Sequence, residues 1–122
     1  MHDAPMDRRV LVIDDHPGLR ASARLLLEGG GFDVVGEAAD GRAGLAAATA
    51  LRPDVVLLDI VLPDLDGFEV ARRLAAGDHG PVVVLVSTRD ERDYGGRVAR
   101  AGVGGFLQKS KLSIRALEAL VG

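Results

Sequence analysis

Three aspartates stand directly after short apolar runs of the chain, and their carboxylates could share one cation. Asp14 and Asp15 follow residues 10–13, and Asp59 follows residues 55–58. Carboxylates brought close together repel one another strongly unless a cation lies between them. Mg²⁺ suits such a set, because it favours carboxylates, waters and phosphate oxygens in octahedral geometry. If the fold brings these aspartates together, we expect a magnesium site.

Hydroxyl and ammonium groups follow two further apolar runs. Ser87 and Thr88 come after residues 82–86, and Lys109 comes shortly after the weaker run at residues 106–107. Taken singly, each polar group has an ordinary structural role: an Asp pair caps a turn, a strand-end lysine is solvated, and a hydroxyl binds nearby backbone or water. Their occurrence at one end of the predicted sheet is what indicates a site.

A magnesium ion beside a carboxylate, a lysine and a hydroxyl is suited to phosphoryl transfer. In that reaction the protein mainly positions groups and neutralises charge on the phosphoryl oxygens. The hypothesis is that Asp59 attacks phosphorus in line and Mg²⁺ bridges it to the phosphoryl oxygens. Lys109 and Ser87 would hold the remaining oxygens. The product would be an aspartyl phosphate.

The strands that must position these groups alternate with segments of helical spacing. Four runs predict buried strands: residues 10–13, 55–58, 82–86 and 106–107. Residues 32–38 predict a partly exposed edge strand, because their apolar alternation is interrupted by polar residues. Such alternation predicts parallel strands joined by right-handed crossovers, with helices on both faces.

The predicted class is α/β, a flavodoxin-like (βα)5 three-layer sandwich. Its five-stranded parallel sheet should have the order 2-1-3-4-5, with the ligand beyond the carboxyl ends of strands 1 and 3. Five helices are expected: from Pro17 to the glycines at 29–31, over about 41–51, after an N-cap at Asp66, around Tyr94 to Ala101, and after an N-cap at Ser113. The fourth contains Gly95 and Gly96, which cost about 1 kcal/mol each inside a helix. We expect that helix to be mobile or frayed.

Length and composition exclude several classes of function. The 122 residues fit one domain, and we expect residues 1–7 to be a flexible tail and residues 8–122 to be the domain. The absence of cysteine excludes disulfides, zinc–thiolate sites and thiol catalysis. A net charge of −3, with one Tyr and three Phe, argues against direct nucleic-acid binding.

The chain also carries no sign of a membrane or secretory role. Its apolar runs are too short to span a bilayer. The N-terminus lacks the basic start and the apolar stretch of a secretory signal. We therefore expect a cytoplasmic protein.

From about Arg8 onward the sequence resembles a known family. The landmarks occur in one order: Asp14-Asp15-His16-Pro17, Asp59, Pro63 to Gly67, Ser87, and Gly105 to Lys109. Together they resemble the receiver domain of bacterial response regulators. They are most similar to the receivers that precede a helix-turn-helix DNA-binding domain in NarL/FixJ-type regulators.

The resemblance implies a phosphoacceptor receiver of a two-component phosphorelay. A sensor histidine kinase would donate the phosphoryl group to Asp59. Mg²⁺ would be bound by Asp15, Asp59 and the backbone carbonyl of Val61, with Asp14 acting largely through water. The domain would be a signalling module rather than an enzyme, since it would catalyse only its own phosphorylation and dephosphorylation.

The resemblance also implies a switch. Ser87 would swing toward the phosphoryl group and Phe106 would follow it inward, with Thr88 beside them. The surface of the fourth helix, fifth strand and fifth helix would change as a result. Output would pass to a homodimer formed through that surface, to a downstream protein, or to an output domain outside this chain. An aromatic residue in a strand is as often a simple core residue, as Phe106 would then be.

Four positions depart from the commonest pattern of the family. Thr88 stands where a small residue is usual, and its bulk should slow entry of large phosphodonors or water. Ser110 replaces a proline, so the turn after Lys109 should differ. Val61 and Arg89 occupy positions that tune phosphoryl lifetime. An apolar Val61 cannot orient an attacking water, so we expect slow self-dephosphorylation; rapid loss of label that Val61→Asn left unchanged would contradict this.

Three alternatives compete with phosphotransfer. The first is a phosphorylation-independent, receiver-like protein-interaction module, which the complete acidic set with Lys109 disfavours. The second is a phosphohydrolase with an aspartate nucleophile, but such enzymes need a second carboxylate two residues on, where this chain has Val61. The third is a flavin or dinucleotide binder, but the glycines at 29–31 follow a predicted helix and cannot cradle a phosphate at its start.

Overall fold

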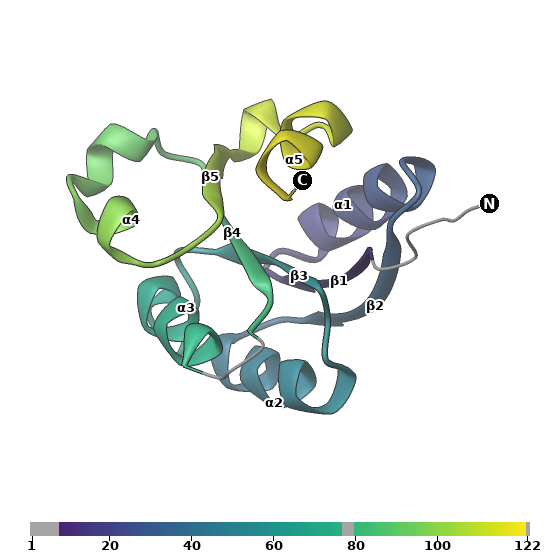
Figure 1. Cartoon of the computed structure of the whole chain (residues 1–122), viewed down its shortest axis with the longest axis horizontal. Helices are drawn as coiled ribbons and strands as arrows, with labels where there is room; N and C mark the ends of the chain where they lie inside the picture. Colours follow the sequence, from purple (N-terminus) through teal and green to yellow (C-terminus); the bar gives the residue numbers. More distant parts are fainter. Residues whose placement is uncertain (1–7, 77–79, 122) are drawn as a thin grey trace.

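One parallel sheet organises the molecule. The computed structural model describes residues 8–76 and 80–121, and in them five strands pair in the order β2-β1-β3-β4-β5 (Figure 1). The strands are β1 (Arg9–Ile13), β2 (Asp33–Ala38), β3 (Val55–Asp59), β4 (Val82–Ser87) and β5 (Gly105–Gln108). Every pairing is parallel. The predicted flavodoxin-like α/β class and strand order are confirmed.

Helices lie on both faces of this sheet. They are α1 (Pro17–Gly29), α2 (Gly41–Leu51), α3 (Gly67–Ala75), α4 (Arg97–Arg100) and α5 (Ile114–Val121), with 3-10 turns η1 (Glu91–Tyr94) and η2 (Lys109–Lys111). In Figure 1, α1 and α5 lie on one side of the strands and α2 and α3 on the other. None of the helices in the described ranges is long and apolar enough to cross a membrane.

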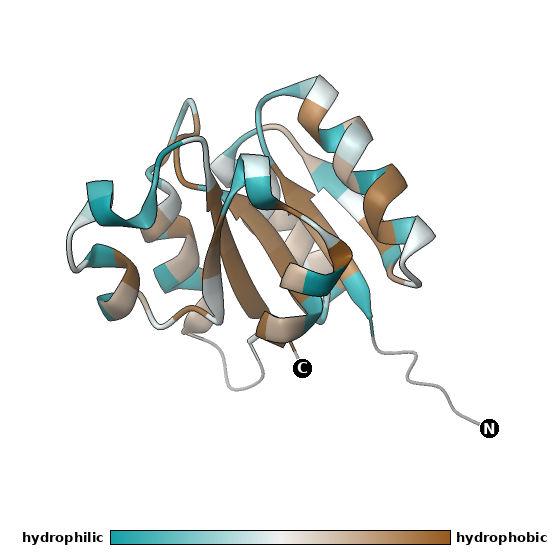
Figure 2. Ribbon diagram, turned by 90° about the horizontal axis from the view of Figure 1, so that it is seen from above, coloured by the Kyte–Doolittle hydropathy of each residue, from teal (hydrophilic) through white to brown (hydrophobic). Residues whose placement is uncertain are grey.

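Alternate strand residues divide the core into two clusters. Val10 and Val12 point toward α1 and α5 and pack with Leu27 and Leu117. Leu11 and its alternates point the other way, toward α2 and α3. Figure 2 shows the strands as the most apolar part of the fold, between helices of mixed polarity. A sheet covered on both faces needs such continuous apolar strands, and this requirement is what makes the runs recognisable in the sequence.

Of the two edge strands, β2 agrees with its prediction, whereas the burial of β5 differs from it. β2 is an edge strand, as expected, and pairs only with β1 among the described strands. Residues 106–107 were expected to form a buried strand, and that prediction is wrong, because all four residues of β5 are only half-buried. β5 is the opposite edge of the sheet and pairs with β4 alone in the described structure.

The fourth helical segment is broken at its glycines. Tyr94 lies in the turn η1, and Gly95 follows with a φ of 59°, a conformation that favours glycine. α4 then spans only four residues. The prediction of one helix carrying both Tyr94 and Val98 is therefore wrong, whereas its weakness at the glycine pair is confirmed. Its mobility stays a prediction.

Two contacts hold the loop that follows β3. A Cβ on Gly67 would lie 2.6 Å from the carbonyl oxygen of Asp59, so only glycine lets α3 begin this close to the strand end. Asp64 accepts hydrogen bonds from the backbone N–H groups of Gly41 at 2.7 Å and Arg42 at 2.9 Å. The loop is thus tied both to α3 and to the start of α2.

The predicted tail, residues 1–7, lies outside the described residues, as does residue 122.

Candidate functional site

Two buried carboxylates meet at the carboxyl end of the sheet. Asp59 is the last residue of β3, and Asp14 follows directly on β1, whose Ile13 pairs with Leu58. The two aspartates are 3% and 1% exposed, whereas Asp15 faces solvent. Adjacent parallel strands that end together thus place both carboxylates side by side, as the strand-end argument predicted.

A fourth ligand-type side chain lies at this cluster. Oxygen or nitrogen atoms of Asp14, Asp15, His16 and Asp59 all lie within 4.8 Å of one another. His16 Nδ1 is 3.1 Å from Asp14 Oδ1 and 3.1 Å from Asp15 Oδ1. In the sequence, His16 appeared only as part of the family landmark Asp14-Asp15-His16-Pro17 and was not predicted to be a ligand. Its adjacency to Asp15 was the one available signal.

Lys109 reaches the carboxylates from the far edge of the sheet. Its Nζ lies 2.9 Å from Asp14 Oδ2 and 3.3 Å from Asp59 Oδ2. Among the described residues, Asp14 Oδ2 is a buried oxygen that makes no well-directed hydrogen bond, and the Lys109 ammonium is its close charged neighbour. A buried carboxylate oxygen without a directed hydrogen bond, beside other oxygen ligands, fits a hard divalent cation such as Mg²⁺.

The electrostatics of the site favour an added cation. Burial, and then repulsion from the Asp14 carboxylate, raise the pKa of Asp59 above its ordinary value, although Lys109 opposes the shift. Burial lowers the pKa of Lys109, but the two carboxylates raise it by more, so its net shift is upward. Lys109 is therefore charged, and one ammonium faces two buried carboxylates. The unbalanced negative charge is what a metal ion would neutralise.

Val61 contributes backbone rather than side chain to the site. Its N–H donates to Asp59 Oδ1 at 3.2 Å, and a bridge to Asp66 holds the loop. The Val61 side chain is 65% exposed. Metal binding by its carbonyl and slow self-dephosphorylation both stay predictions.

Ser87 lies at the same edge of the sheet, but its hydroxyl is hydrogen-bonded to Tyr94 and Arg89 and not to the carboxylates. Its buried Oγ is 2.6 Å from the hydroxyl of Tyr94 and accepts from the Arg89 N–H at 3.0 Å. Thr88 is exposed beside it, and its carbonyl accepts from the Gln108 side chain at 3.2 Å. The sequence pattern placed Tyr94 only in the fourth predicted helix and gave no indication of this hydrogen bond.

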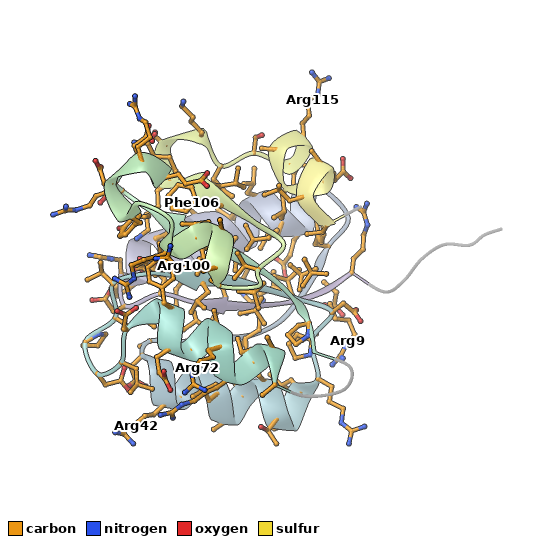
Figure 3. The ribbon with its side chains drawn as sticks, turned by 60° about the vertical axis from the view of Figure 1, so that its left-hand side comes forward. Arg9, Arg42, Arg72, Arg100, Phe106 and Arg115 are labelled. Atoms are coloured by element: carbon orange, nitrogen blue, oxygen red, sulfur yellow. The ribbon has the colours of Figure 1, made fainter. Side chains whose placement is uncertain are left out.

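Phe106 lies in an aromatic cluster with Tyr94 and Phe68. The ring centroids of Tyr94 and Phe106 are 6.1 Å apart, and those of Tyr94 and Phe68 are 5.7 Å apart. In Figure 3, Arg115 extends outward from the surface, whereas Phe106 lies within the outline of the fold.

Ser110, which stands where a proline is usual in the family, lies in the turn η2 after β5. Every peptide bond of the described residues is trans.

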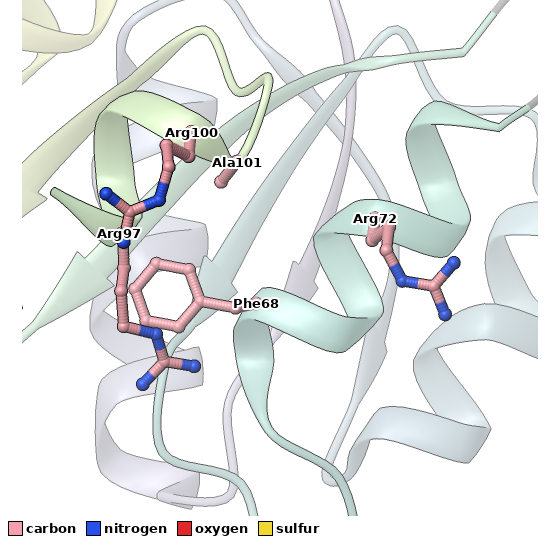
Figure 4. A pocket seen from close by; sticks show the side chains of 5 residues that line it. All are labelled: Phe68, Arg72, Arg97, Arg100 and Ala101. Atoms are coloured by element: carbon pink, nitrogen blue, oxygen red, sulfur yellow. The ribbon is translucent and has the colours of Figure 1, made fainter.

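An arginine-lined hollow separates α3 from α4 near this cluster (Figure 4). It has a volume of about 270 Å³ and is lined by Phe68, Arg72, Arg97, Arg100 and Ala101. Arg97 lies 4.2 Å above the Phe68 ring and pairs with Asp66 at 2.9 Å. Arg72 pairs with Glu69. Two of the three guanidinium groups are thus already neutralised within the chain.

Comparison with known proteins agrees with this geometry. A family model described as the response regulator receiver domain matches residues 10–121. The transcription regulator BvgA of Bordetella pertussis is 39% identical over 104 residues, 85% of this chain and 50% of BvgA. The DNA-binding transcriptional activator EvgA of Escherichia coli is 30% identical over 101 residues, 83% of this chain and 50% of EvgA. This chain therefore spans about half the length of these curated relatives.

A solved structure shows the same architecture. The signal receiver domain of the response regulator NarL from Mycobacterium tuberculosis superposes with a TM-score of 0.84 at 36% sequence identity. The match covers 97% of this chain and 99% of that one. Fold, site and sequence agree, and the chain belongs to the response regulator receiver domain family.

Proposed function

We propose that this receiver accepts a phosphoryl group on Asp59 from a sensor histidine kinase, in a reaction that needs Mg²⁺. The observation that carries the proposal is the meeting of buried Asp59 and Asp14 with the ammonium of Lys109. A carboxylate nucleophile with charge-neutralising groups around it is what phosphoryl transfer requires.

The residues take separate roles in this proposal. Asp14, Asp15, Asp59 and the Val61 carbonyl would hold the ion, which supplies positive charge that offsets the phosphoryl oxygens. A carboxylate oxygen of Asp59 forms the new bond to phosphorus while the bond from phosphorus to the kinase histidine breaks. Lys109 already lies 3.3 Å from Asp59 Oδ2, so it is within reach of a phosphoryl group on that carboxylate.

The signal would leave through the surface formed by α4, β5 and α5. We propose that Ser87 turns toward the phosphoryl group, that Phe106 follows it, and that Thr88 limits access to the site. The changed surface would act on a second copy of the chain, on a downstream protein, or on an output domain outside this sequence. The DNA-binding relative EvgA supports transcriptional control as the output.

Direct nucleic-acid binding by this domain is not proposed. Its proposed catalysis is limited to its own phosphorylation and dephosphorylation. We also propose that the domain acts in the cytoplasm, where it would meet the kinase.

The test is the intact mass of the chain after incubation with acetyl phosphate and Mg²⁺. We expect one phosphoryl addition, lost in Asp59→Asn and in the presence of a metal chelator. Asp33→Asn is the matched control, because Asp33 is an exposed aspartate at the amino end of β2, opposite the carboxyl ends of the strands that carry the site. This variant should be phosphorylated like the native chain.

The alternative is a receiver-like interaction module that works without phosphorylation. It would be supported if neither acetyl phosphate nor a phosphorylated kinase modified the chain and if Mg²⁺ left its thermal unfolding unchanged. Bulk at Thr88 could exclude one donor, but it would not abolish metal binding. The metal-binding measurement therefore separates a blocked receiver from a chain that has no phosphotransfer function.

A further inference from the structure

The hydroxyl of Tyr94 is bonded to the side chain that the proposed switch must move. Ser87 Oγ lies 2.6 Å from the Tyr94 hydroxyl and also accepts from the Arg89 N–H at 3.0 Å. A serine hydroxyl has one donor and two acceptor positions. Whichever partner donates, two of these three positions are occupied, and Oγ is held toward η1.

We propose that Tyr94 is a positioning residue whose hydroxyl holds Ser87 in the conformation of the unphosphorylated chain. The inference rests on the proposed phosphorylation of Asp59 and adds a residue to its control. Phosphorylation draws Ser87 toward the phosphoryl oxygens, and the bond between Ser87 and Tyr94 breaks as it does so. Tyr94 therefore biases the equilibrium between two positions of Ser87.

The ring of Tyr94 connects this bond to the neighbouring elements. It packs edge-on against Phe68 of α3, at an interplanar angle of 64°, and lies tilted against Phe106 of β5, at 57°. Phe106 has no hydroxyl, so of these three aromatic residues only Tyr94 can hydrogen-bond to Ser87. Phe68 in turn carries the Arg97 guanidinium on its face (Figure 4). A shift of Tyr94 therefore alters packing at α3, at β5 and at the surface of α4.

The backbone beneath Tyr94 is suited to such a shift. Tyr94 ends a four-residue turn that is capped on itself, because the Asp90 side chain accepts from the turn and the Asp93 side chain accepts from the Asp90 N–H. Gly95 follows with a φ of 59°. A short, self-capped turn that ends in glycine can move as a unit while few hydrogen bonds are lost.

Fluorescence provides a direct observation of this residue. Tyr94 is the only tyrosine, and the chain has no tryptophan, so tyrosine emission reports on this position alone. We expect emission to change when Mg²⁺ and beryllium fluoride, an analogue of the acyl phosphate, are added to the native chain. The change should be absent in Asp59→Asn. Unchanged emission in a native chain that binds beryllium fluoride would overturn the proposal.

Kinetics of phosphorylation by acetyl phosphate test the bond itself. Tyr94→Phe keeps the ring and removes one hydroxyl, so it should phosphorylate about threefold to tenfold faster than the native chain, as loss of one hydrogen bond from the resting state predicts. In a Ser87→Ala background the same substitution should change the rate by less than about twofold, because the partner is gone.

The outcomes separate this inference from the proposed function. A Tyr94→Phe variant with the native or a slower rate, or with the same effect in both backgrounds, overturns the role of Tyr94 while phosphorylation of the native chain stands. A native chain that accepts no phosphoryl group overturns both. Circular dichroism of Tyr94→Phe must match the native spectrum, and Val98→Ala serves as a control for a general loosening of the α4 segment.

Discussion

Two segments of the chain contribute to one sheet but differ in helix length and in strand burial. They are the N-terminal segment, residues 8–76, and the C-terminal segment, residues 80–121. In the N-terminal segment α1 has 13 residues and α2 has 11, and all five residues of β3 are buried. In the C-terminal segment β4 is well buried, but α4 and β5 have four residues each and no residue of β5 is fully buried.

The chemistry is divided between the segments in the same way. The carboxylates of Asp14 and Asp59 belong to the N-terminal segment, and both are buried. Ser87 and Lys109, which would contact the phosphoryl group, belong to the C-terminal segment, and the elements between them, η1, α4 and β5, are the thinly packed ones. Regions with few buried contacts open and shift at low free-energy cost, and switching elements are drawn from them. We infer that one segment positions the site and that the other responds to it.

The largest expected effect compares the same truncation in both segments. Val12 of β1 is 1% exposed in a core cluster, whereas Val98 of α4 is 6% exposed and belongs to neither cluster. Val12→Ala should lower the free energy of unfolding by about 2.5 kcal/mol and Val98→Ala by about 1 kcal/mol, because a cavity in a closed core cannot collapse. Urea denaturation measures both. Equal losses would break the comparison.

The next effect concerns glycine, whose replacement by alanine should have opposite signs in the two segments. Gly95→Ala should cost about 1.5 kcal/mol, because the φ of 59° at Gly95 strains any residue with a Cβ. Gly29 ends α1, and the space that a methyl group would occupy there is open, so Gly29→Ala should stabilise the fold by about 0.5 kcal/mol. Thermal unfolding of the two variants checks the signs, and stabilisation by Gly95→Ala would show that the turn after η1 is not constrained.

The third effect concerns the site, where the two segments meet. The raised pKa of Asp59 means that the folded state favours its protonated form. The stability from this group is present below the unfolded-state pKa of about 4 and is lost as pH rises through the folded-state pKa. Without metal at pH 7, Asp59→Asn should therefore be more stable than the native chain by about 1 kcal/mol, or roughly 4 °C in Tm.

The pH and metal dependence sharpen that prediction. The difference in Tm between Asp59→Asn and the native chain should narrow as the pH falls toward the ordinary range of aspartate. Mg²⁺ should raise the Tm of the native chain more than that of the variant. A native chain that exceeds Asp59→Asn in stability at pH 7 with a chelator present would mean that Lys109 compensates both carboxylates fully.

The sheet and most of the site could be predicted because they follow from the order of apolar and polar residues along the sequence. Continuous apolar runs identify parallel strands, and the residue after each run must lie at the carboxyl edge. Asp14 and Asp59 meet for that reason, because β1 and β3 are neighbours. Lys109 stands at the same edge, and its long side chain reaches the carboxylates across β4.

The remainder could not be predicted because it depends on short-range geometry. The bond between Ser87 and Tyr94 exists because a 3-10 turn brings residue 94 back over the strand end, and a stripe of helical spacing carries no information about that turn. The half-burial of β5 depends on what covers a sheet edge. His16 reaches the carboxylates through the bend that follows β1, which the pattern Asp-Asp-His does not specify.

The order of the strands along the chain has a consequence for how the protein folds. β1 and β3 are neighbours, so every carboxylate of the site is present once residue 59 has been synthesised, whereas Lys109 lies 50 residues beyond Asp59. An intermediate in which β1 has paired with β3 before β5 docks holds Asp14 beside Asp59 without the ammonium, and their repulsion destabilises it. Addition of β5 completes the sheet and brings Lys109 to the carboxylates, so the charge balance of the site forms last.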